Sequence, residues 1–321
     1  MAWSSTRDGG GRILRRAATP VGVTVALATS LLGLVVAPAA AGTRAVATGT
    51  WTASQLPVPP DAFADGAGYA GPIACPAIGG CVVLGEYSSA SGLDEDFIAT
   101  EKAGVWSTAR APLPPGGAQA ANLGPYTLAC TGVGYCVGTS LYLSPTAVAV
   151  DLLEEWGGIW TAIAMPMPSN ASPAHVPTLS AMTCPRLGGC VIVGTYGTQS
   201  GLSEGFVVLQ EGKAFVATEA PIPAKSSRGS ALNGIACTAV ATCSAVGDFV
   251  TASGRREPLI VNDTAGALTA VQAPLPPKAA ANPQAELEAV SCGSTTSCVA
   301  LGAYAGADGD HLGVIDTSSS G

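Results

Sequence analysis

The stretch IACPAIGGCVVLGEY, residues 73–87, decides the fold, because its pattern returns five times along the chain. Two cysteines stand six positions apart in it, with a proline and glycines between them and apolar residues on both sides. Short apolar runs bounded by glycine and proline are typical of β-strands joined by a turn. The stretch therefore predicts a β-hairpin in which the two cysteines face each other.

Five such cysteine pairs contain all ten cysteines of the chain, and the first cysteines recur at intervals of 55, 54, 53 and 55 residues. A fixed period of this length indicates a repeat architecture. Cysteines opposite one another in a hairpin lie near the distance that a disulfide requires, whereas zinc sites favour closer cysteine spacing. We therefore expect one disulfide per repeat: Cys75–Cys81, Cys130–Cys136, Cys184–Cys190, Cys237–Cys243 and Cys292–Cys298.

Each repeat has room for four short strands. In the first repeat, apolar runs occupy residues 73–75, 81–84 and 96–100, and a fourth run begins at Val105-Trp106 after a glycine. No helical periodicity interrupts these runs, and four strands in roughly 50 residues are typical of one propeller blade. The sequence thus predicts an all-β fold, a five-bladed β-propeller with four antiparallel strands per blade.

The two ends of the repeat array complement each other. A large apolar residue opens each fourth strand, and in four repeats it follows the second cysteine by 24 or 25 residues. After Cys298 this position would fall beyond the last residue, Gly321. The missing strand is found at the other end, as Gly49-Thr50-Trp51. We therefore expect an N-terminal strand to complete the last blade and close the ring. The strand-opening residues are Trp51, Trp106, Trp160, Phe215 and Leu268.

The N-terminal region has the pattern of an export signal. A basic segment precedes an uncharged apolar run, residues 17–36, and the triplet AAA at residues 39–41 matches a cleavage site. We expect residues 1–41 to be removed as a signal peptide and residues 42–321 to form a single domain. Retention of the apolar run as an uncleaved membrane anchor is the alternative, because its length is sufficient to span a bilayer.

Charge and cysteine content limit the classes of partner and the location. The chain has 14 basic and 22 acidic residues, and without residues 1–41 it keeps ten basic and 21 acidic ones, a net charge of −11. Nucleic-acid binding needs a surplus of lysine and arginine on one face, so this class is excluded. An even number of cysteines in an exported chain favours an oxidising location, either secreted or associated with the cell envelope.

The repeat resembles that of secreted actinobacterial β-propeller repeat proteins, and more distantly the sialidase-type (BNR/Asp-box) and photosystem-assembly-factor propellers. The resemblance covers residues 49–317 and rests on the cysteine pair, the glycine and aromatic residue after it, the Gly-x-Trp and the Pro-x-Pro. It implies an exported propeller. The Asp-box hairpin S-x-D-x-G-x-x-W is reduced to its glycine and tryptophan at residues 101–106 and 154–160, so the resemblance does not imply sialidase activity.

Catalytic motifs have weak support. Residues 201–205 match the G-x-S-x-G nucleophile motif, which requires a strand, a turn and a helix. They align with residues 91–96 of the first repeat, between the second and third predicted strands, so we interpret them as a turn. The only two histidines, His175 and His311, lie in different segments, which argues against a Ser-His-Asp triad and a histidine metal site. We predict no catalytic residue and no metal ligand of this kind.

Two groups of residues are candidate ligand contacts. The first is an aromatic residue after the second strand of four repeats, which either stacks on sugars or packs between blades. The second is a set of acidic residues in the first and last repeats, which a closed ring would bring together as a calcium site or a docking patch. Solvated turns are the alternative for the acidic set. The candidates are Tyr87, Tyr196, Phe249 and Tyr304, and Asp94, Glu95, Asp96, Asp308 and Asp310.

The sequence predicts an exported, non-enzymatic binding or scaffold module whose partner is a protein or glycan of the cell envelope. Recognition is expected on the face with the Pro-rich linkers, since long connections carry most variation. Two alternatives stay open. A degenerate sialidase- or glycosidase-like enzyme would need a converging carboxylate pair, and an envelope-anchored structural repeat protein would keep residues 17–36 in the membrane. No cofactor is predicted, with calcium as the only candidate.

Overall fold

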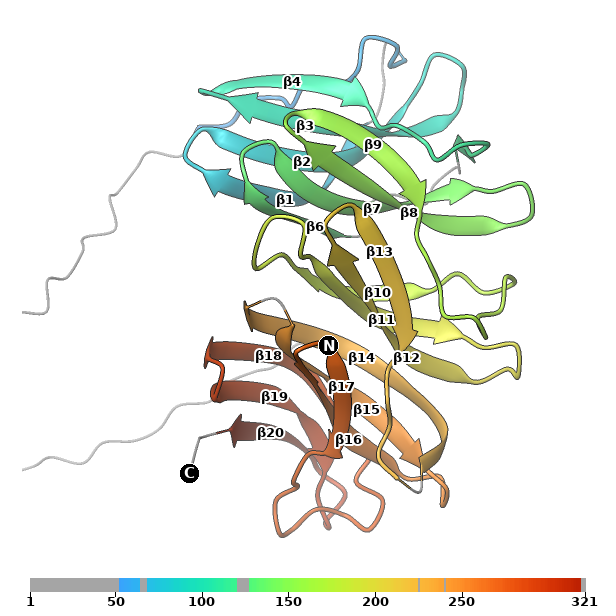
Figure 1. Ribbon diagram of the computed structural model, residues 1–321, viewed down its shortest axis with the longest axis vertical. Helices are drawn as coiled ribbons and strands as arrows, with labels where there is room; N and C mark the ends of the chain where they lie inside the picture. Colours follow the sequence, from blue (N-terminus) through green and yellow to red (C-terminus); the bar gives the residue numbers. More distant parts are fainter. Residues whose placement is uncertain (1–51, 64–67, 120–126, 225, 240, 319–321) are drawn as a thin grey trace, which may run out of the picture. The chain divides into compact units, whose positions relative to one another are not determined.

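The computed structural model describes residues 52–63, 68–119, 127–224, 226–239 and 241–318. Among these residues there is no helix, and twenty strands form five antiparallel sheets (Figure 1). The chain divides into two units, Met1–Ala53 and Ser54–Gly321, and every strand belongs to the second. The predicted all-β class is confirmed. The described part of the chain also lacks any helical stretch with the length and hydropathy of a membrane span.

The sheets follow one another along the chain, and in four of them each strand pairs with the next strand along the chain. Sheet 1 contains β1 (Gly68–Ala77), β2 (Gly80–Ser88), β3 (Asp94–Lys102) and β4 (Val105–Arg110). Sheet 2 contains β5 (Ala118–Gln119), β6 (Thr127–Gly132), β7 (Tyr135–Leu143), β8 (Val148–Trp156) and β9 (Ile159–Ala164). Sheet 3 contains β10 (Thr178–Thr183), β11 (Val191–Gly197), β12 (Ser203–Glu211) and β13 (Ala214–Glu219). Sheet 4 contains β14 (Ser226–Ala239), β15 (Thr242–Thr251), β16 (Arg256–Thr264) and β17 (Ala267–Gln272).

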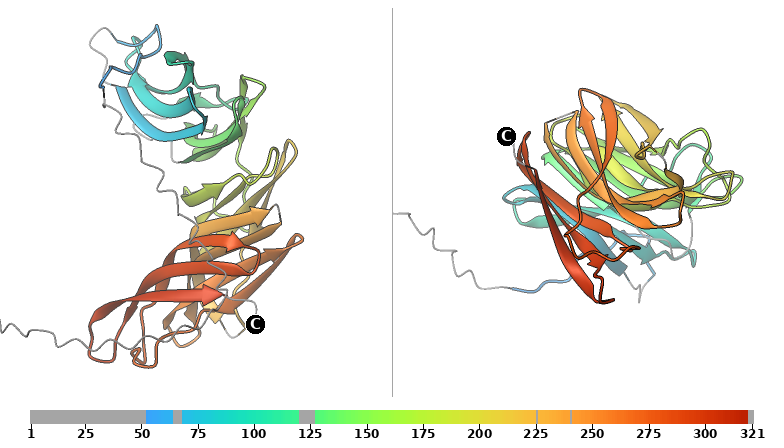
Figure 2. Two further views of the ribbon diagram at one scale, coloured as in Figure 1. Left: turned by 90° about the vertical axis from the view of Figure 1, so that its left-hand side faces the viewer. Right: turned by 90° about the horizontal axis from the view of Figure 1, so that it is seen from below.

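Sheet 5 differs from the others in having three strands among the described residues: β18 (Glu286–Ser294), β19 (Ser297–Ala305) and β20 (His311–Ser318). They lie side by side as the red arrows of Figure 2. The predicted fourth strand of this sheet, residues 49–51, lies outside the described residues, as do the signal peptide and the alternative anchor. Closure of the five sheets into a propeller stays a prediction.

The five predicted disulfides are present, one at the first hairpin of each sheet. Cys237 and Cys243 are direct partners in the register of β14 and β15, as the spacing predicted. Such a bond holds a hairpin together by restricting the unfolded chain. Five disulfides fit an oxidising environment outside the cytoplasm.

Each sheet has two faces that pack differently. Side chains alternate between the two faces along a strand. We call the face that carries the aromatic residue six positions after the second cysteine the A face, and we call the opposite face the B face. In sheet 3, Phe206 of the A face packs in one cluster with residues of sheet 2, whereas Val193 and Val207 of the B face pack with sheet 4. The same B-to-A packing joins sheets 1 and 2, and sheets 4 and 5. The core therefore consists of apolar layers between successive sheets.

Close strand packing requires a glycine four positions after the second cysteine in four of the five sheets. At Gly247, a Cβ atom would lie 1.9 Å from the carbonyl oxygen of Ala231 on the neighbouring strand. In sheet 2 this position is Ser140, and its register partner is Asp151 instead of an apolar residue. The residues at the partner position in the other sheets are Phe97, Phe206, Leu259 and Val314. Sheet 2 therefore places a polar pair inside an apolar layer.

Candidate functional site

The Pro-rich linkers and the turns between second and third strands share one edge of their sheets, which we call the linker edge. Isolated β-bridges join the two segments in three sheets: Ala62 to Ser89, Ala171 to Thr198 and Ala279 to Gly306. The linkers and the turns therefore lie together in these three sheets. Each bridge holds a loop at a defined place, so the linker edge presents side chains from a fixed backbone.

Four equivalent positions meet at the linker edge of a sheet: the A-face aromatic residue, its register partner on the third strand, the last residue of the fourth strand, and a linker residue. The first two are Tyr87–Glu95, Tyr142–Ala149, Tyr196–Glu204, Phe249–Glu257 and Tyr304–Leu312 in sheets 1 to 5. The fourth strands of sheets 1 to 4 end with Arg110, Ala164, Glu219 and Gln272. The positions repeat, but their chemistry differs from sheet to sheet.

Sheet 1 fills these positions with a charged network. The Tyr87 hydroxyl donates to Asp61 Oδ1 at 2.9 Å and to Glu95 Oε2 at 3.1 Å. Arg110 Nε lies 2.6 Å from the same Glu95 oxygen. Burial, reinforced by hydrogen bonds to the two carboxylates, raises the pKa of Tyr87, so the hydroxyl stays a donor at physiological pH.

Sheet 3 fills the same four positions with neutral and acidic side chains. The Tyr196 hydroxyl donates to Asn170 Oδ1 at 2.8 Å and to Glu219 Oε2 at 2.9 Å, and Asn170 Nδ2 donates to that Glu219 oxygen at 2.7 Å. Glu204, on the third strand, accepts from the Ser230 hydroxyl at 2.9 Å. Burial and, more weakly, the charge of Glu219 raise the pKa of Glu204. Here too every polar group at the four positions is engaged.

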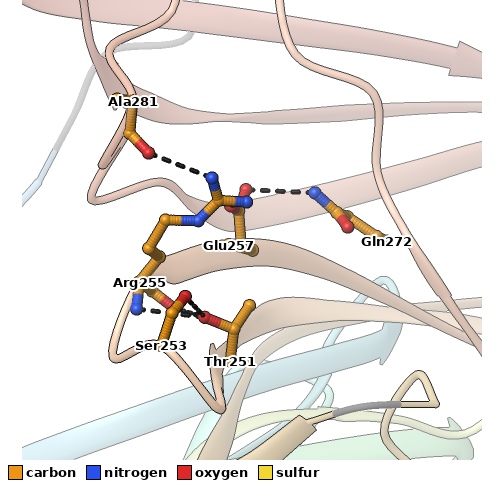
Figure 3. Close-up of polar contacts among 6 residues, drawn as sticks. All are labelled: Thr251, Ser253, Arg255, Glu257, Gln272 and Ala281. Carbon is orange, nitrogen blue, oxygen red and sulfur yellow. Dashed lines mark hydrogen bonds and ion pairs between the residues drawn. The ribbon is translucent and has the colours of Figure 1, made fainter.

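Sheet 4 has a phenylalanine, Phe249, in place of the tyrosine, and its buried Glu257 is held by other side chains. Gln272 Nε2 donates to Glu257 Oε2 at 3.0 Å, and an Arg255 guanidinium nitrogen lies 2.7 Å from Glu257 Oε1 (Figure 3). Arg255 also donates to the carbonyl oxygen of Ala281 at 3.2 Å, which ties the turn to the linker after β17. The carboxylate is therefore paired on both oxygens.

Sheet 2 lacks this network and has a cavity in its place. The glutamate position is Ala149 and the end of the fourth strand is Ala164, and both line a cavity of about 330 Å³ between sheets 2 and 3. Tyr142 is one of the lining residues and is 5% exposed, and its ring lies close to Gly117 of the preceding linker. Its hydroxyl has no hydrogen-bond partner among the described residues. Small apolar side chains thus stand in sheet 2 where the other sheets have glutamate, arginine or glutamine, beside an open space.

The rest of the cavity wall is mostly apolar with a few polar groups. Met165, Met167 and Pro168 form the apolar part, and Ser172 and His175 stand on the linker side. A hydrogen bond of 3.2 Å joins His175 Nδ1 to the Ser172 hydroxyl. Ligand sites commonly combine an apolar wall with a small number of polar groups, and their volumes begin at about 300 Å³. This cavity is the candidate binding site.

The predicted aromatic candidates are core residues in the structure. Tyr87, Tyr196, Phe249 and Tyr304 are all buried, and two of the tyrosines pack edge-on against Phe97 and Phe206. Of the two interpretations given above, packing in the core therefore applies to these four rings, and stacking on sugars does not. The sequence comparison missed the fifth ring, Tyr142, because its repeat has serine in place of the glycine that marks the other four. Counting six positions from Cys136 would have found it.

The predicted acidic candidates occupy two different environments. Asp94, Glu95 and Asp96 begin strand β3 and do not form a turn, and Glu95 and Asp96 are buried. The solvated-turn alternative was wrong for these two residues, because Tyr87, Arg110 and Ser140 supply partners that a solvated turn would lack. Asp96 lies in a strand, as the predicted run of residues 96–100 has it, and the strand begins two residues earlier. Asp308 and Asp310 are exposed in the turn before β20. Within the described ranges, no three residues of the metal-binding types gather around one point.

The G-x-S-x-G motif is a turn followed by a strand. Gly201 N–H donates to the Thr198 carbonyl oxygen, and Ser203 begins β12. The turn interpretation therefore holds for Gly201 and Leu202, whereas Ser203–Gly205 belong to β12, and no helix follows at this place. His311 begins β20, while His175 lies in the linker before β10, so the structure provides no pairing of the serine with either ring.

A buried pair of carboxylates lies in the layer between sheets 1 and 2. The Ser140 hydroxyl donates to Asp96 of sheet 1, and the Ser140 N–H donates to Asp151 Oδ1 at 3.0 Å. Burial first, and the charge of Glu86 second, raise the pKa of Asp96 to about 6. Burial and the charge of Asp96 raise the pKa of Asp151 to about 7. Asp151 is 1% exposed, so this pair faces no open substrate site.

Comparisons with known proteins leave the family open. No family model matches the chain, and no curated protein matches it. One similar solved structure is an arginine-to-alanine triple mutant of AofleA from Arthrobotrys oligospora. It is 14% identical over 80% of this chain and 87% of that chain, with a TM-score of 0.35. A similarity of this level carries no argument about fold or function, so the functional conclusion rests on the geometry of the linker edge.

Proposed function

We propose that the chain is an exported, non-enzymatic binding module and that its ligand enters the cavity between sheets 2 and 3. The proposal rests on a difference between the sheets. On the third strand, sheets 1, 3 and 4 bury a glutamate together with its partners. At the equivalent position and at the end of its fourth strand, sheet 2 has Ala149 and Ala164, which line an open volume of about 330 Å³. The substitution removes the polar side chains that fill these positions in the other sheets and leaves two methyl groups at the wall of the cavity. A repeat protein gains recognition where one unit departs from the others.

The expected ligand is a glycan or a side chain of a cell-envelope protein that combines an apolar surface with hydroxyl or amide groups. Tyr142 offers a hydroxyl, His175 and Ser172 offer further polar contacts, and the methionines offer an adaptable apolar wall. A net charge of −11 for residues 42–321 disfavours strongly acidic polymers. Export is supported by the five disulfides and by the signal pattern of residues 1–41.

The test is a binding survey with purified residues 42–321. We expect saturable binding to one class among soluble glycans, isolated envelope polymers and detergent-extracted envelope proteins, measured by calorimetry or by retention on the immobilised material. Calcium is added in a parallel series, and unchanged binding is expected if the exposed Asp308 and Asp310 do not form a cation site. Absence of saturable binding to all three classes would contradict the proposed function.

A further inference from the structure

A second cavity lies at the opposite end of the strands, between sheets 1 and 2. We call this end the hairpin edge; in these two sheets it is formed by the turns at residues 78–79, 103–104, 133–134 and 157–158. The two turns of sheet 2 are tied together, because the Gly157 N–H donates to the Gly134 carbonyl oxygen at 2.8 Å. The cavity has a volume of about 290 Å³. It shares none of its described lining residues with the cavity between sheets 2 and 3.

One part of the cavity wall is apolar. It is formed by side chains of both sheets: Pro76 and Val82 of sheet 1, and Val133 and Tyr135 of sheet 2. The ring of Tyr135 packs edge-on against Trp156, with 5.9 Å between the ring centroids, so the aromatic part of the wall has a fixed place. Burial of apolar surface against such a wall favours a ligand that has an apolar stem.

The polar part of the wall contains a buried carboxylate with an unused oxygen. Glu155 of β8 is 5% exposed and lines the cavity. Its Oε2 is buried and has no hydrogen-bond partner among the described residues, and none of their ion pairs includes this glutamate. A buried acceptor without a partner is unfavourable, so a donor that enters the cavity gains a strong hydrogen bond there.

The equivalent residue of sheet 3 shows how this position can be satisfied. Glu155 pairs with the first large residue of the fourth strand, and Gln210 has the same place in sheet 3. Gln210 accepts from the Cys190 N–H at 3.2 Å and donates to Glu154 of sheet 2 at 2.5 Å. The space beside it is only about 10 Å³. Sheet 1 has Thr100 in the place of Glu154, and this shorter side chain leaves the cavity open beside Glu155.

A lysine stands at the rim of the cavity. Lys102, the last residue of β3, is exposed and belongs to the lining. Burial raises the pKa of Glu155, and the charge of Lys102 lowers it. An exposed ammonium group interacts weakly with its neighbours because water screens it, so it compensates the carboxylate in part. The charged lining residues are Glu101, Lys102 and Glu155, two acidic and one basic, which gives the wall a net charge of −1.

We propose that this cavity binds an organic cation with a short apolar stem, a primary alkylammonium group, which donates to Oε2 of Glu155. An ammonium group is a compact charge that pairs with a single oxygen, whereas a guanidinium group favours two. The stem lies against the apolar wall, and Lys102 competes with the ligand for the carboxylate. The site is independent of the proposed function, since it lies at the other edge and between another pair of sheets.

An NMR titration of the ¹⁵N-labelled chain tests the site, with the amides of Gly134 and Gly157 as reporters of the cavity. At about pH 8, above the ordinary pKa of a glutamate, we expect n-butylammonium to shift them saturably with a Kd in roughly the millimolar range. The neutral n-butanol is the matched ligand and should give no saturable shift. A short lysine peptide and its norleucine analogue identify the source: binding of the lysine peptide assigns the site to a protein side chain, and binding of butylammonium alone assigns it to a free amine.

Two substitutions assign the contact. Glu155→Gln keeps the shape of the side chain and is expected to weaken butylammonium binding by about tenfold or more, because it removes the charge. Glu211→Gln, at the exposed end of β12, is the matched control and should bind as the native chain does. Lys102→Met removes the competing cation and is expected to tighten binding by about threefold. Because Lys102 is exposed, this variant keeps the test open if Glu155→Gln does not fold.

Four results would overturn the proposal. They are equal binding of butanol and butylammonium, native affinity in a folded Glu155→Gln chain, and unchanged or weaker binding in Lys102→Met. The fourth is the absence of a saturable shift in the native chain. If Lys102→Met then binds butylammonium, Lys102 itself is the cation that occupies the cavity.

Discussion

Reduction of the five disulfides is expected to unfold the protein under conditions in which the oxidised form is stable. Each bond closes a short loop of sequence separation 6, and the chain-entropy model gives about 2 kcal/mol for such a loop. Five bonds then contribute about 10 kcal/mol, which is comparable with the total stability of an ordinary domain, about 5–15 kcal/mol. Few aromatic residues, 5% of the chain, are present to compensate in the core.

Urea unfolding followed by circular dichroism, with and without a phosphine reductant, measures this effect. We expect the reduced and alkylated chain to have no folded baseline at 25 °C. Exposure predicts the order of reduction: Cys75 is exposed, whereas Cys136 and Cys190 are buried, so the bond of sheet 1 reacts first. A reduced chain with the same unfolding midpoint as the oxidised chain would contradict this prediction.

The free energy of unfolding is expected to fall as pH rises from about 4 to about 7. Asp96 and Asp151 have pKa values raised to about 6 and about 7, above the ordinary value of 3.8, chiefly because both are buried. Between pH 4 and pH 7 the folded state binds more protons than the unfolded state. The free energy of unfolding is therefore higher at low pH and falls as Asp96 and Asp151 ionise in the folded state. At about 1.4 kcal/mol for each group and each pH unit, the two groups together lose several kcal/mol of stability over this range.

Asp151→Asn isolates this contribution. The amide oxygen can still accept from the Ser140 N–H, but the group no longer ionises, and the charge that acts on Asp96 disappears. We expect the variant to be more stable than the native chain at pH 8, with a much weaker pH dependence. Asp308→Asn, in an exposed turn, is the matched control and should leave the pH dependence unchanged. An Asp151→Asn variant with the native pH dependence would contradict the assignment.

The regular features of the fold were predictable because they repeat. Hairpins, disulfides and strand order follow from the cysteine spacing and from apolar runs bounded by glycine and proline, and each instance supports the others. The start of β3 was misplaced because Asp94-Glu95-Asp96 is a poor strand sequence by local propensity. Long-range partners, Tyr87 on β2 and Ser140 on β7, overrode that propensity, and no local pattern contains this information.

The candidate site was missed because it depends on what one repeat lacks. Sequence reasoning searched for carboxylates and aromatic residues that are present, whereas the cavity arises where Ala149 and Ala164 replace the residues of other sheets. An alignment of the repeats shows the difference, because Ala149 stands where the other repeats have Glu95, Glu204 and Glu257. Its meaning is not readable without the structure, because only three-dimensional contacts show that those glutamates fill a space beside the aromatic ring.

Recognition through the cavity between sheets 2 and 3 can be blocked by copying the charged pair of sheet 1 into sheet 2. Ala149→Glu/Ala164→Arg introduces the pair that Glu95 and Arg110 form and fills the cavity without a foreign geometry. The matched control is Leu312→Glu, at the same repeat position of sheet 5.

Titration of the envelope material that binds residues 42–321 is the measurement, with Tm recorded for each variant. We expect at least a tenfold loss of affinity for the double variant, a ΔΔG of about 1.4 kcal/mol or more, with a native-like Tm, and no loss for Leu312→Glu. Native affinity in a folded Ala149→Glu/Ala164→Arg variant, or loss of affinity in Leu312→Glu alone, would show that the ligand binds elsewhere.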